Sequence, residues 1–228
     1  MVHQHKPLVV FLMETKRKNH EMEWLRSRWK FDNCFTVDGS GRGGGLALLW
    51  MREAGVEVLS FSKYHIDVKV EAEMEGGSWR FTGFYGDPET SKRYKSWELL
   101  RQLKQAYRLP WLCAGDFNEI ISMDEKMGGA VRPESQMMQF RETLVDCNLQ
   151  ELKVIGGKFT WTRGKGSTAI LERLDRGLVN ESWLELFPYS VEQHMGVTGS
   201  DHVPLIFNIN ANRQQSKHYR RPFKFENM

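Results

Sequence analysis

The sequence predicts an α/β fold, and three observations support this prediction. Short apolar runs alternate with segments whose apolar residues recur at steps of three and four, and Gly, Pro or Asp stands at the switches. Of the 228 residues, 40% are hydrophobic and 27% charged, as in an ordinary globular protein. Length and pattern together favour one domain over residues 1–211, followed by a basic linker or tail over residues 212–228.

Strands are expected where β-branched and aromatic residues gather in short runs. These runs are residues 8–13, 31–37, 46–50, 56–61, 66–71, 79–85, 111–114, 159–162, 173–179 and 204–209. The first of them is followed directly by the carboxylate of Glu14, and residues 111–114 are followed by Gly115 and then by Asp116.

Three helices are expected between these strands, because each segment has an apolar stripe that would face the core. The stripes are Met22, Leu25 and Trp29; Trp97, Leu100, Leu103 and Tyr107; and Met137, Phe140, Leu144 and Cys147. Thr90 and Ser91 after Pro88 predict the start of the second helix, and Pro110 predicts its end.

Bulk properties argue against several classes of protein. Cys34, Cys113 and Cys147 are widely spaced and form no Cys-x-x-Cys pair, so neither a disulfide framework nor a structural zinc site is indicated. The apolar runs are too short to span a membrane, and the N-terminus lacks a signal-peptide layout. We expect an intracellular protein in a reducing compartment; the nucleus is compatible, although no targeting signal is evident. The net charge of +3 permits a polyanionic partner without indicating one.

Polar residues with chemical potential follow two of the early strands. Glu14 comes directly after residues 8–13, and carboxylate oxygens suit Mg²⁺ or Mn²⁺. Taken alone, Glu14 is better interpreted as a surface residue. Tyr85 lies where a strand enters a Gly and Pro turn, a position that either presents a phenol to a phosphate or serves the structure.

Further candidates follow the later strands. Asp116 and Asn118 come after residues 111–114 and would face the same side of an extended chain; the alternative is a strand-ending turn. Asp175 lies on a predicted strand, where a salt bridge with a neighbouring Arg is the alternative. Asp201 and His202 precede residues 204–209 and offer a metal carboxylate beside an acid or base.

These motifs occur in the order found in the endonuclease/exonuclease/phosphatase superfamily, which the chain resembles over about residues 6–210. They are Met-Glu-Thr at 13–15, Gly-Phe-Tyr-Gly at 83–86, Gly-Asp-Phe-Asn-Glu at 115–119, Arg-Leu-Asp at 173–175 and Ser-Asp-His at 200–202. Residues 11–16, 44–50 and 159–161 look more closely like the endonuclease domains of plant LINE-type retrotransposons. Residues 220–228 look like the connector that joins such a domain to a reverse transcriptase.

The resemblance implies a four-layer fold, with two β-sheets packed face to face and flanked by helices. The active site is then expected at one edge of the sandwich. It would hold Mg²⁺ (or Mn²⁺) through Glu14, with Asp201 close to the ion or to its coordinated water. The implied activity is DNA nicking that leaves a 3′-hydroxyl end.

The resemblance also implies roles for the remaining candidates. Asp116 would orient or deprotonate the attacking water. Asn118 and Tyr85 would hydrogen-bond the scissile phosphate, and His202, oriented by Asp175, would complete this contact. The sequence leaves open which group takes the proton of the water.

Residues near the predicted strand at 159–162 suggest a contact with DNA. Trp161 and Arg163 combine an aromatic and a basic group, which serve stacking and phosphate contact, although a strand Trp is more often part of a core. The Gly-rich residues 39–45 lack the Lys and Ser or Thr that close a phosphate-binding loop, so we expect a turn into the next strand.

The sequence departs from the family pattern at its start. Family members begin with a strand that carries an active-site Asn, and nothing before residue 8 matches it. We therefore expect the first family strand to be missing and the isolated chain to be weakly active or inactive. An upstream strand with an Asn should then restore folding and nicking.

Two further functions stay open beside the DNA endonuclease. One is hydrolysis of a small phosphomonoester or lipid headgroup by the same fold and metal. The other is a catalytically impaired remnant of a retrotransposon protein. Cleavage of supercoiled plasmid, compared with phosphate release from inositol phosphates, discriminates among them.

Overall fold

The computed structural model describes residues 2–17, 19–39, 44–72, 77–196 and 199–209. The predicted basic tail, residues 212–228, lies outside these ranges. The helices are α1 (Val2–His5), α2 (Asn19–Trp29), α3 (Tyr94–Ala106), α4 (Glu134–Cys147) and α5 (Glu181–Leu186). Short 3₁₀ turns cover Arg52–Ala54, Thr90–Lys92, Met123–Glu125 and Gly166–Thr168.

A six-stranded sheet forms the centre of the molecule, in the order β4-β5-β6-β7-β13-β9. Its strands are β4 (Val56–Ser62), β5 (His65–Ala72), β6 (Gly77–Tyr85), β7 (Trp111–Asp116), β13 (Asp175–Val179) and β9 (Gln150–Glu151). Neighbouring strands are antiparallel except β6 and β7, which are parallel. The ends of β6 and β7 therefore meet at one edge of the sheet, where a functional site is favoured.

Two three-stranded sheets form the facing layer. One has the order β1-β3-β2, with β1 (Val9–Leu12), β3 (Leu46–Trp50) and β2 (Asn33–Val37). The other has the order β10-β14-β15, with β10 (Lys153–Ile155), β14 (Val191–His194) and β15 (Leu205–Asn208). Leu48 of β3 and Phe207 of β15 pack in the same core cluster as Val68 of the central sheet. Both small sheets thus cover one face of the six-stranded sheet.

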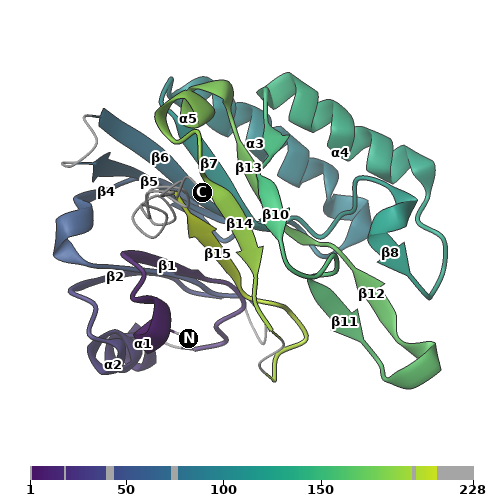
Figure 1. Cartoon of the computed structure of the whole chain (residues 1–228), viewed down its shortest axis with the longest axis horizontal. Helices are drawn as coiled ribbons and strands as arrows, with labels where there is room; N and C mark the ends of the chain where they lie inside the picture. The colour runs from purple at the N-terminus through teal and green to yellow at the C-terminus, as the bar shows by residue number, and fades with distance from the viewer. Residues whose placement is uncertain (1, 18, 40–43, 73–76, 197–198, 210–228) are drawn as a thin grey trace, which may run out of the picture.

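Helices lie on the outer face of the central sheet and on the outer face of β1-β3-β2, as Figure 1 shows. α3 and α4 lie on the central sheet, where Trp97 and Phe140 stack with ring centroids 4.6 Å apart. α2 packs on the outer face of β1-β3-β2 through Met22, which contacts the cluster of Ala47 and Leu49. The predicted α/β sandwich of two packed sheets flanked by helices is confirmed.

A fourth sheet, β11-β12-β8, extends from one end of the sandwich in Figure 1. It consists of β11 (Trp161–Arg163), β12 (Ile170–Glu172) and β8 (Lys126–Met127). The hairpin of β11 and β12 carries the residues expected to contact DNA.

Several boundaries differ from the predictions. The segment of Thr90 forms a 3₁₀ turn, and α3 begins only after Arg93, without a side-chain cap. The Asp87 side chain accepts the Glu89 N–H at 2.9 Å and so caps this turn instead. Tyr107 follows α3 in an extended conformation and is 41% exposed, so it is not part of the buried stripe.

Two further features concern the expectations about cysteines and membranes. Cys34, Cys113 and Cys147 are all free. No helix among the described residues is long and apolar enough to cross a membrane. β1 and β15 each have one hydrogen-bonded neighbour in the described part of the chain. The absence of the first family strand stays a prediction.

Candidate active site

Three adjacent strands bring Tyr85, Asp116 and Asp175 into one row. In the parallel pair β6 and β7, Tyr85 lies opposite Asp116. In the antiparallel pair β7 and β13, Asp116 lies opposite Asp175. All three side chains are buried. Because sheet hydrogen bonds fix this register, the backbone holds the row at the edge of the central sheet.

Glu14 reaches the row from the facing layer, two residues beyond the end of β1. Tyr85 donates a hydrogen bond from its hydroxyl to Glu14 Oε1. The other oxygen of the half-exposed Glu14 carboxylate lies 3.6 Å from Lys16 Nζ. Burial and the bond to Glu14 raise the pKa of Tyr85 above its usual value, so the phenol keeps its proton at neutral pH.

The end of the Gly-rich segment holds the Glu14 loop. The backbone N–H groups of Thr15 and Lys16 donate to the carbonyls of Gly45 and Gly44, both at 3.1 Å. Glu14 has a φ of +49°, which is uncommon for a residue with a side chain. Gly45 has a φ of +92°, and a Cβ there would lie 2.6 Å from Thr15 Oγ1. Glycine is therefore required where this loop passes the next strand.

Asp116 and Asn118 meet through a turn and not along an extended strand. β7 ends at Asp116, and Asn118 has a left-handed φ of +55°. Asp116 accepts the Asn118 backbone N–H at 2.7 Å and its side-chain Nδ2–H at 2.9 Å. Asn118 Nδ2 also donates to the Gly86 carbonyl at 3.0 Å. The predicted extended arrangement is wrong and the alternative, a strand-ending turn, is found, because the chain turns after Asp116 and brings the two side chains together.

Asp175 and His202 form a hydrogen-bonded pair. Asp175 Oδ2 lies 2.8 Å from His202 Nδ1. The expected alternative, an ion pair of Asp175 with a neighbouring arginine, is not found among the described residues. Arg173 and Arg176 instead contact Glu125, at 3.2 Å and 2.9 Å. The carboxylate of Asp175 is thus reserved for the histidine.

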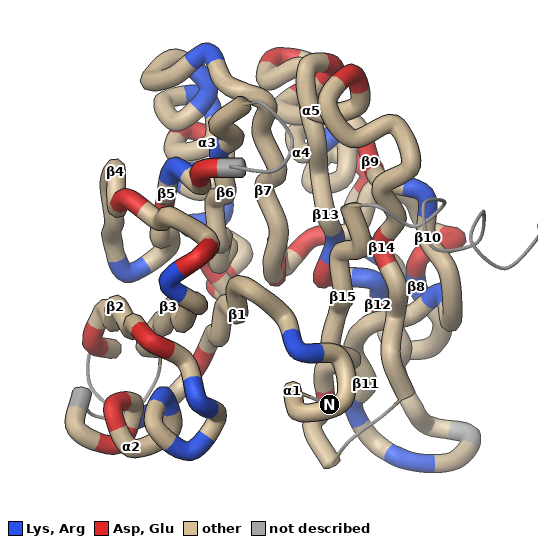
Figure 2. The backbone as a smooth tube through the Cα atoms, turned by 60° about the vertical axis from the view of Figure 1, so that its left-hand side comes forward, with Lys and Arg blue, Asp and Glu red and all other residues tan. Residues whose placement is uncertain are grey.

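Trp161 links the β11-β12-β8 sheet to the segment of His202. Its indole N–H donates to Asp201 Oδ2 at 3.2 Å, and its ring centroid lies 6.5 Å from that of His202. Asp201 is exposed, and its carbonyl accepts the Thr162 N–H at 2.9 Å. Arg163 is exposed at the end of β11, where Figure 2 marks basic positions on the hairpin. Trp161 therefore borders the site, and Arg163 lies two residues farther along the hairpin.

Burial and neighbouring charges raise the pKa values of Asp116 and His202, so both groups hold their protons to a higher pH than usual. Burial and the charge of Asp175 raise the pKa of Asp116 to about 7, against the opposing influence of His202 and the Asn118 N–H. Burial lowers the pKa of His202, but its bond to Asp175 and the charges of Asp175, Asp116 and Asp201 outweigh burial and raise this pKa to about 9. At neutral pH His202 is an imidazolium, and Asp116 is close to its midpoint.

The side chains at this edge fit a divalent cation. Among the described residues, ligand atoms of Asp116, Asp175 and His202 all lie within 4.8 Å of one another. Because Asp175 is bonded to a protonated His202, Asp116 is the member of this group that offers a carboxylate to an ion. Glu14 adds a carboxylate whose second oxygen already faces the cationic Lys16. Carboxylate oxygens are the ligands that Mg²⁺ and Mn²⁺ prefer. A cation here would also offset the repulsion by Asp175, which raises the pKa of Asp116 in addition to the larger effect of burial.

Sequence reasoning missed residues that support these side chains. The sulfur of Met13 accepts the Asp116 N–H at 3.2 Å. The hydroxyl of Thr160 accepts the backbone N–H of Asp175 at 2.9 Å. Met13 directly precedes Glu14, and Thr160 directly precedes Trp161. Their position next to candidate site residues was the signal in the sequence that could have identified them.

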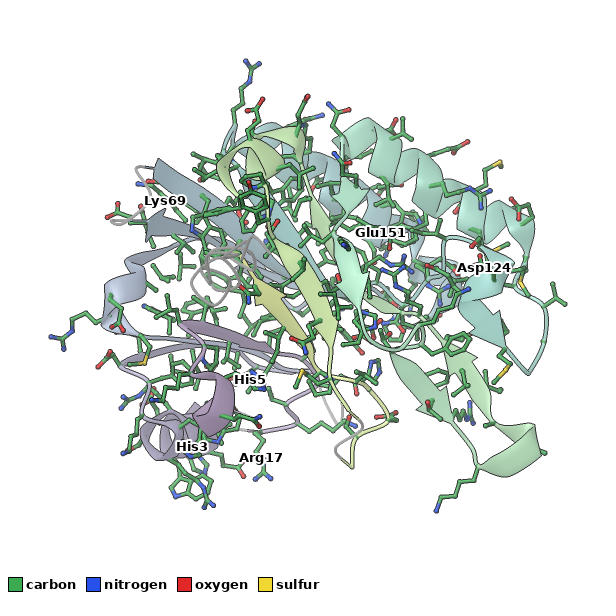
Figure 3. The ribbon with its side chains drawn as sticks, viewed as in Figure 1. His3, His5, Arg17, Lys69, Asp124 and Glu151 are labelled. Carbon is green, nitrogen blue, oxygen red and sulfur yellow. The ribbon has the colours of Figure 1, made fainter. Side chains whose placement is uncertain are left out.

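A network of buried ion pairs lies behind the row, beneath α4. Arg176 is fully buried and contacts Glu125 at 2.9 Å and Glu151 at 2.6 Å; Glu151 is labelled in Figure 3. Glu119, the last residue of the motif at 115–119, contacts Arg93 at 2.6 Å. Since these carboxylates are paired with arginines, we assign Glu119 and Glu125 to the support of the loops and not to the reaction.

Comparison with protein families matches residues 1–202 to the endonuclease/exonuclease/phosphatase family. A search of curated proteins finds no match.

Solved structures of nucleases share the fold. The endonuclease domain of TRAS1, a telomere-specific non-LTR retrotransposon, is 17% identical with a TM-score of 0.63, covering 92% of this chain and 89% of that chain. The 3′-5′ exonuclease NExo from Neisseria meningitidis is 16% identical with a TM-score of 0.65, covering 91% of each chain. An AP endonuclease from Archaeoglobus fulgidus is 15% identical with a TM-score of 0.68, covering 92% of this chain and 91% of that chain. At these identities the likeness establishes the fold.

Proposed function

The chain belongs to the endonuclease/exonuclease/phosphatase family, and we propose that it is a metal-dependent phosphodiesterase that nicks DNA. The observation that carries this proposal is the row of Tyr85, Asp116 and Asp175 at one sheet edge, joined by Glu14 and His202. It combines acidic oxygens for a cation with a cationic imidazole for a phosphate. Phosphodiester cleavage requires both, because negative charge builds on the phosphate oxygens.

Glu14 is the proposed principal ligand of Mg²⁺ or Mn²⁺, with Asp201 near the ion or its water. Glu14 supports this role because it is half exposed and already pairs with a cationic side chain. Asp201 is exposed and can leave its contact with Trp161. A bound divalent cation would neutralise phosphate charge.

Asp116 is the proposed group that orients the attacking water or takes its proton. A pKa of about 7 suits this task, because a base works best when its pKa lies near the working pH. Asn118 supports Asp116 through two hydrogen bonds. A phosphate contact by Asn118 or Tyr85 would require Asn118 to leave Asp116, or Tyr85 to leave Glu14. We therefore assign to Asn118 the positioning of Asp116 and to Tyr85 the positioning of Glu14.

His202 is the proposed phosphate ligand. Its Nδ1–H faces Asp175, which leaves Nε2–H as a donor for a phosphate oxygen. With the pKa of His202 near 9, the ring carries a positive charge at neutral pH. A charged donor forms stronger hydrogen bonds than a neutral one, so it favours the charge of the transition state.

DNA of a target site is the proposed substrate, and a reverse transcriptase domain in a longer parent chain is the proposed partner. The LINE-type motifs and the shared fold of the TRAS1 endonuclease domain support this assignment. Trp161 and Arg163 would contact the DNA beside the site. The nick would leave a 3′-hydroxyl end that primes reverse transcription.

The test is nicking of supercoiled plasmid by the purified chain with Mg²⁺. We expect activity that EDTA removes and that Glu14→Ala and His202→Ala each abolish. Glu89→Ala is the matched control, because Glu89 is an exposed carboxylate that pairs only with neighbours in the turn before α3. It should nick like the parent chain.

Two outcomes would contradict the proposal. Folded protein that leaves plasmid intact would favour the impaired remnant. Phosphate release from inositol phosphates or 3′-phosphorylated DNA, without nicking, would favour a phosphatase of the same family. The second outcome has some support, since one solved structure with the shared fold is described as a 3′ phosphatase, NExo, bound to product DNA hairpin.

A further inference from the structure

Thr160 is a fully buried residue that contacts both segments of the Asp175 and His202 pair. Its hydroxyl accepts the backbone N–H groups of Leu174 and Asp175, at 3.0 Å and 2.9 Å. Its backbone carbonyl accepts the N–H of Val203, the residue after His202, at 2.7 Å. One residue thus holds the start of β13 and the segment that carries the histidine.

The hydroxyl of Thr160 is suited to this double contact. A hydroxyl oxygen has two lone pairs and can accept two N–H donors. The two amides lie at the turn into β13, where Leu174 and Asp175 are themselves buried. Buried backbone N–H groups require partners, and here the side chain of Thr160 supplies both.

No sheet ladder joins Asp175 directly to His202. β13 pairs with β7 and β9, whereas His202 forms an isolated bridge with Trp161. The relative position of the two partners therefore depends on the segment that contacts both. Thr160 lies in this segment, directly before Trp161.

We infer that Thr160 is a positioning residue, which sets the separation of Asp175 and His202 and through it the orientation of the imidazole. Its effect on turnover rests on the proposed nicking function. Its effect on the hydrogen bond between Asp175 and His202 does not, because that bond exists without substrate.

The experiment compares Thr160→Val, which keeps the shape and removes the hydroxyl, with Thr160→Ser, which keeps the hydroxyl. Thr143→Val is the matched control, because Thr143 is also fully buried and its hydroxyl donates to the Gln139 carbonyl within α4. The first readout is the NMR signal of the His202 Nδ1 proton in metal-free protein, identified by its absence in Asp175→Asn. The second is the separate measurement of kcat and KM for nicking.

We expect Thr160→Val to lose or displace the Nδ1 proton signal and to lower kcat roughly 10- to 100-fold, the usual effect of losing a supporting contact, with a smaller change in KM. Thr160→Ser and Thr143→Val should keep the signal and the parental kcat. A folded Thr160→Val with the parental signal overturns the inference. If Thr160→Val fails to fold, Thr160→Ala takes its place. A separate test is hydrogen exchange of the Asp175 backbone amide in the parent protein, because rapid exchange would show that the Thr160 hydroxyl does not hold it and would overturn the inference. If the parent chain does not nick DNA, the NMR result still decides the role of Thr160.

Discussion

Asp175 is the side chain that decides the charge of His202. Burial alone lowers the pKa of this histidine, and the hydrogen bond and charge of Asp175 are the largest influences that raise it to about 9. The remaining contributions come from Asp116 and Asp201. The charge of the imidazole at neutral pH is therefore a property of the pair and not of the histidine alone.

Replacing Asp175 should return His202 to a neutral ring at physiological pH. In Asp175→Asn, we expect the pKa of His202 to fall from about 9 toward or below its ordinary value of 6.5, because burial persists while the largest opposing influence is gone. NMR titration of the imidazole in metal-free protein measures this change. Asp201→Asn is the control and should shift the pKa less. A His202 pKa that stays near 9 in Asp175→Asn would contradict the assignment.

The elements that carry the site could be predicted to different extents. The runs that became β6 and β7 are apolar, so their strands and the polar residues at their ends were visible in the sequence. β14 was missed because its buried face carries Glu192 and His194. Glu192 accepts the Gly177 N–H at 2.6 Å and lies 2.6 Å from His194. Such mutual hydrogen bonding allows polar side chains to be buried in a core, but a strand with polar buried positions lacks the apolar pattern from which a strand is predicted.

The start of α3 depends on a buried ion pair that the helix pattern did not reveal. Arg93 precedes the helix and contacts Glu119 at 2.6 Å, with both side chains almost fully buried. Arg132 also contacts Glu119, at 3.1 Å. The pair thus connects the helix to the loop that follows Asn118.

Breaking this pair should destabilise the protein. Arg93→Met leaves Glu119 buried with fewer partners, and we expect a loss of about 3 kcal/mol, the lower end for a broken buried pair because Arg132 remains. Lys92→Met, the adjacent control, removes an exposed pair with Glu89 and should have little effect. Urea unfolding measures both. Equal midpoints for the two variants would show that the Arg93 pair does not support the fold.

The β11 and β12 hairpin should contribute to DNA affinity through charge. Arg163 is exposed on this hairpin, beyond the contact of Trp161 with Asp201. For Arg163→Ala we expect weaker binding and a salt dependence whose slope falls by about 1, as for the loss of one phosphate contact. Lys69→Ala is the control, since Lys69 pairs with Glu71 on β5, far from the hairpin in Figure 3. Binding isotherms at several salt concentrations measure the slope, and an unchanged slope in Arg163→Ala would exclude the phosphate contact.

At the scale of the whole molecule, many of the helices and strands followed from local patterns, but their arrangement into layers did not. The apolar stripes of α3 and α4 predicted which faces are buried, and Trp97 and Phe140 indeed stack over the central sheet. The facing layer combines β1-β3-β2, from the N-terminal part of the chain, with β10-β14-β15, from the C-terminal part. The placement of two such distant sheets side by side has no signature in a local window of sequence, and only the resemblance to a family predicted the two packed sheets.

The retained proton on His202 should make the stability of the metal-free protein depend on pH. The folded pKa of about 9 lies above the ordinary value of 6.5, so the folded state holds a proton that the unfolded chain releases. The contribution is fully present below pH 6.5 and is lost as the pH rises through 9. Between pH 7 and 9, the free energy of unfolding should therefore fall, and His202 contributes at most about 1.4 kcal/mol per pH unit to this slope, the limit for one proton. Asp116 and the three cysteines also have raised pKa values and add to the same slope, so the share of His202 is the difference from a variant without the imidazole.

Urea unfolding at pH 7, 8 and 9 in the presence of EDTA measures this slope. His202→Asn should make the slope shallower, because the variant has no imidazole to retain the proton. His20→Asn removes an exposed histidine on α2 and should leave the slope as it is in the parent chain. A slope in His202→Asn as steep as that of the parent chain would mean that His202 does not retain a proton on folding. The pair of Asp175 and His202 would then not be the source of the positive charge on which phosphate binding depends.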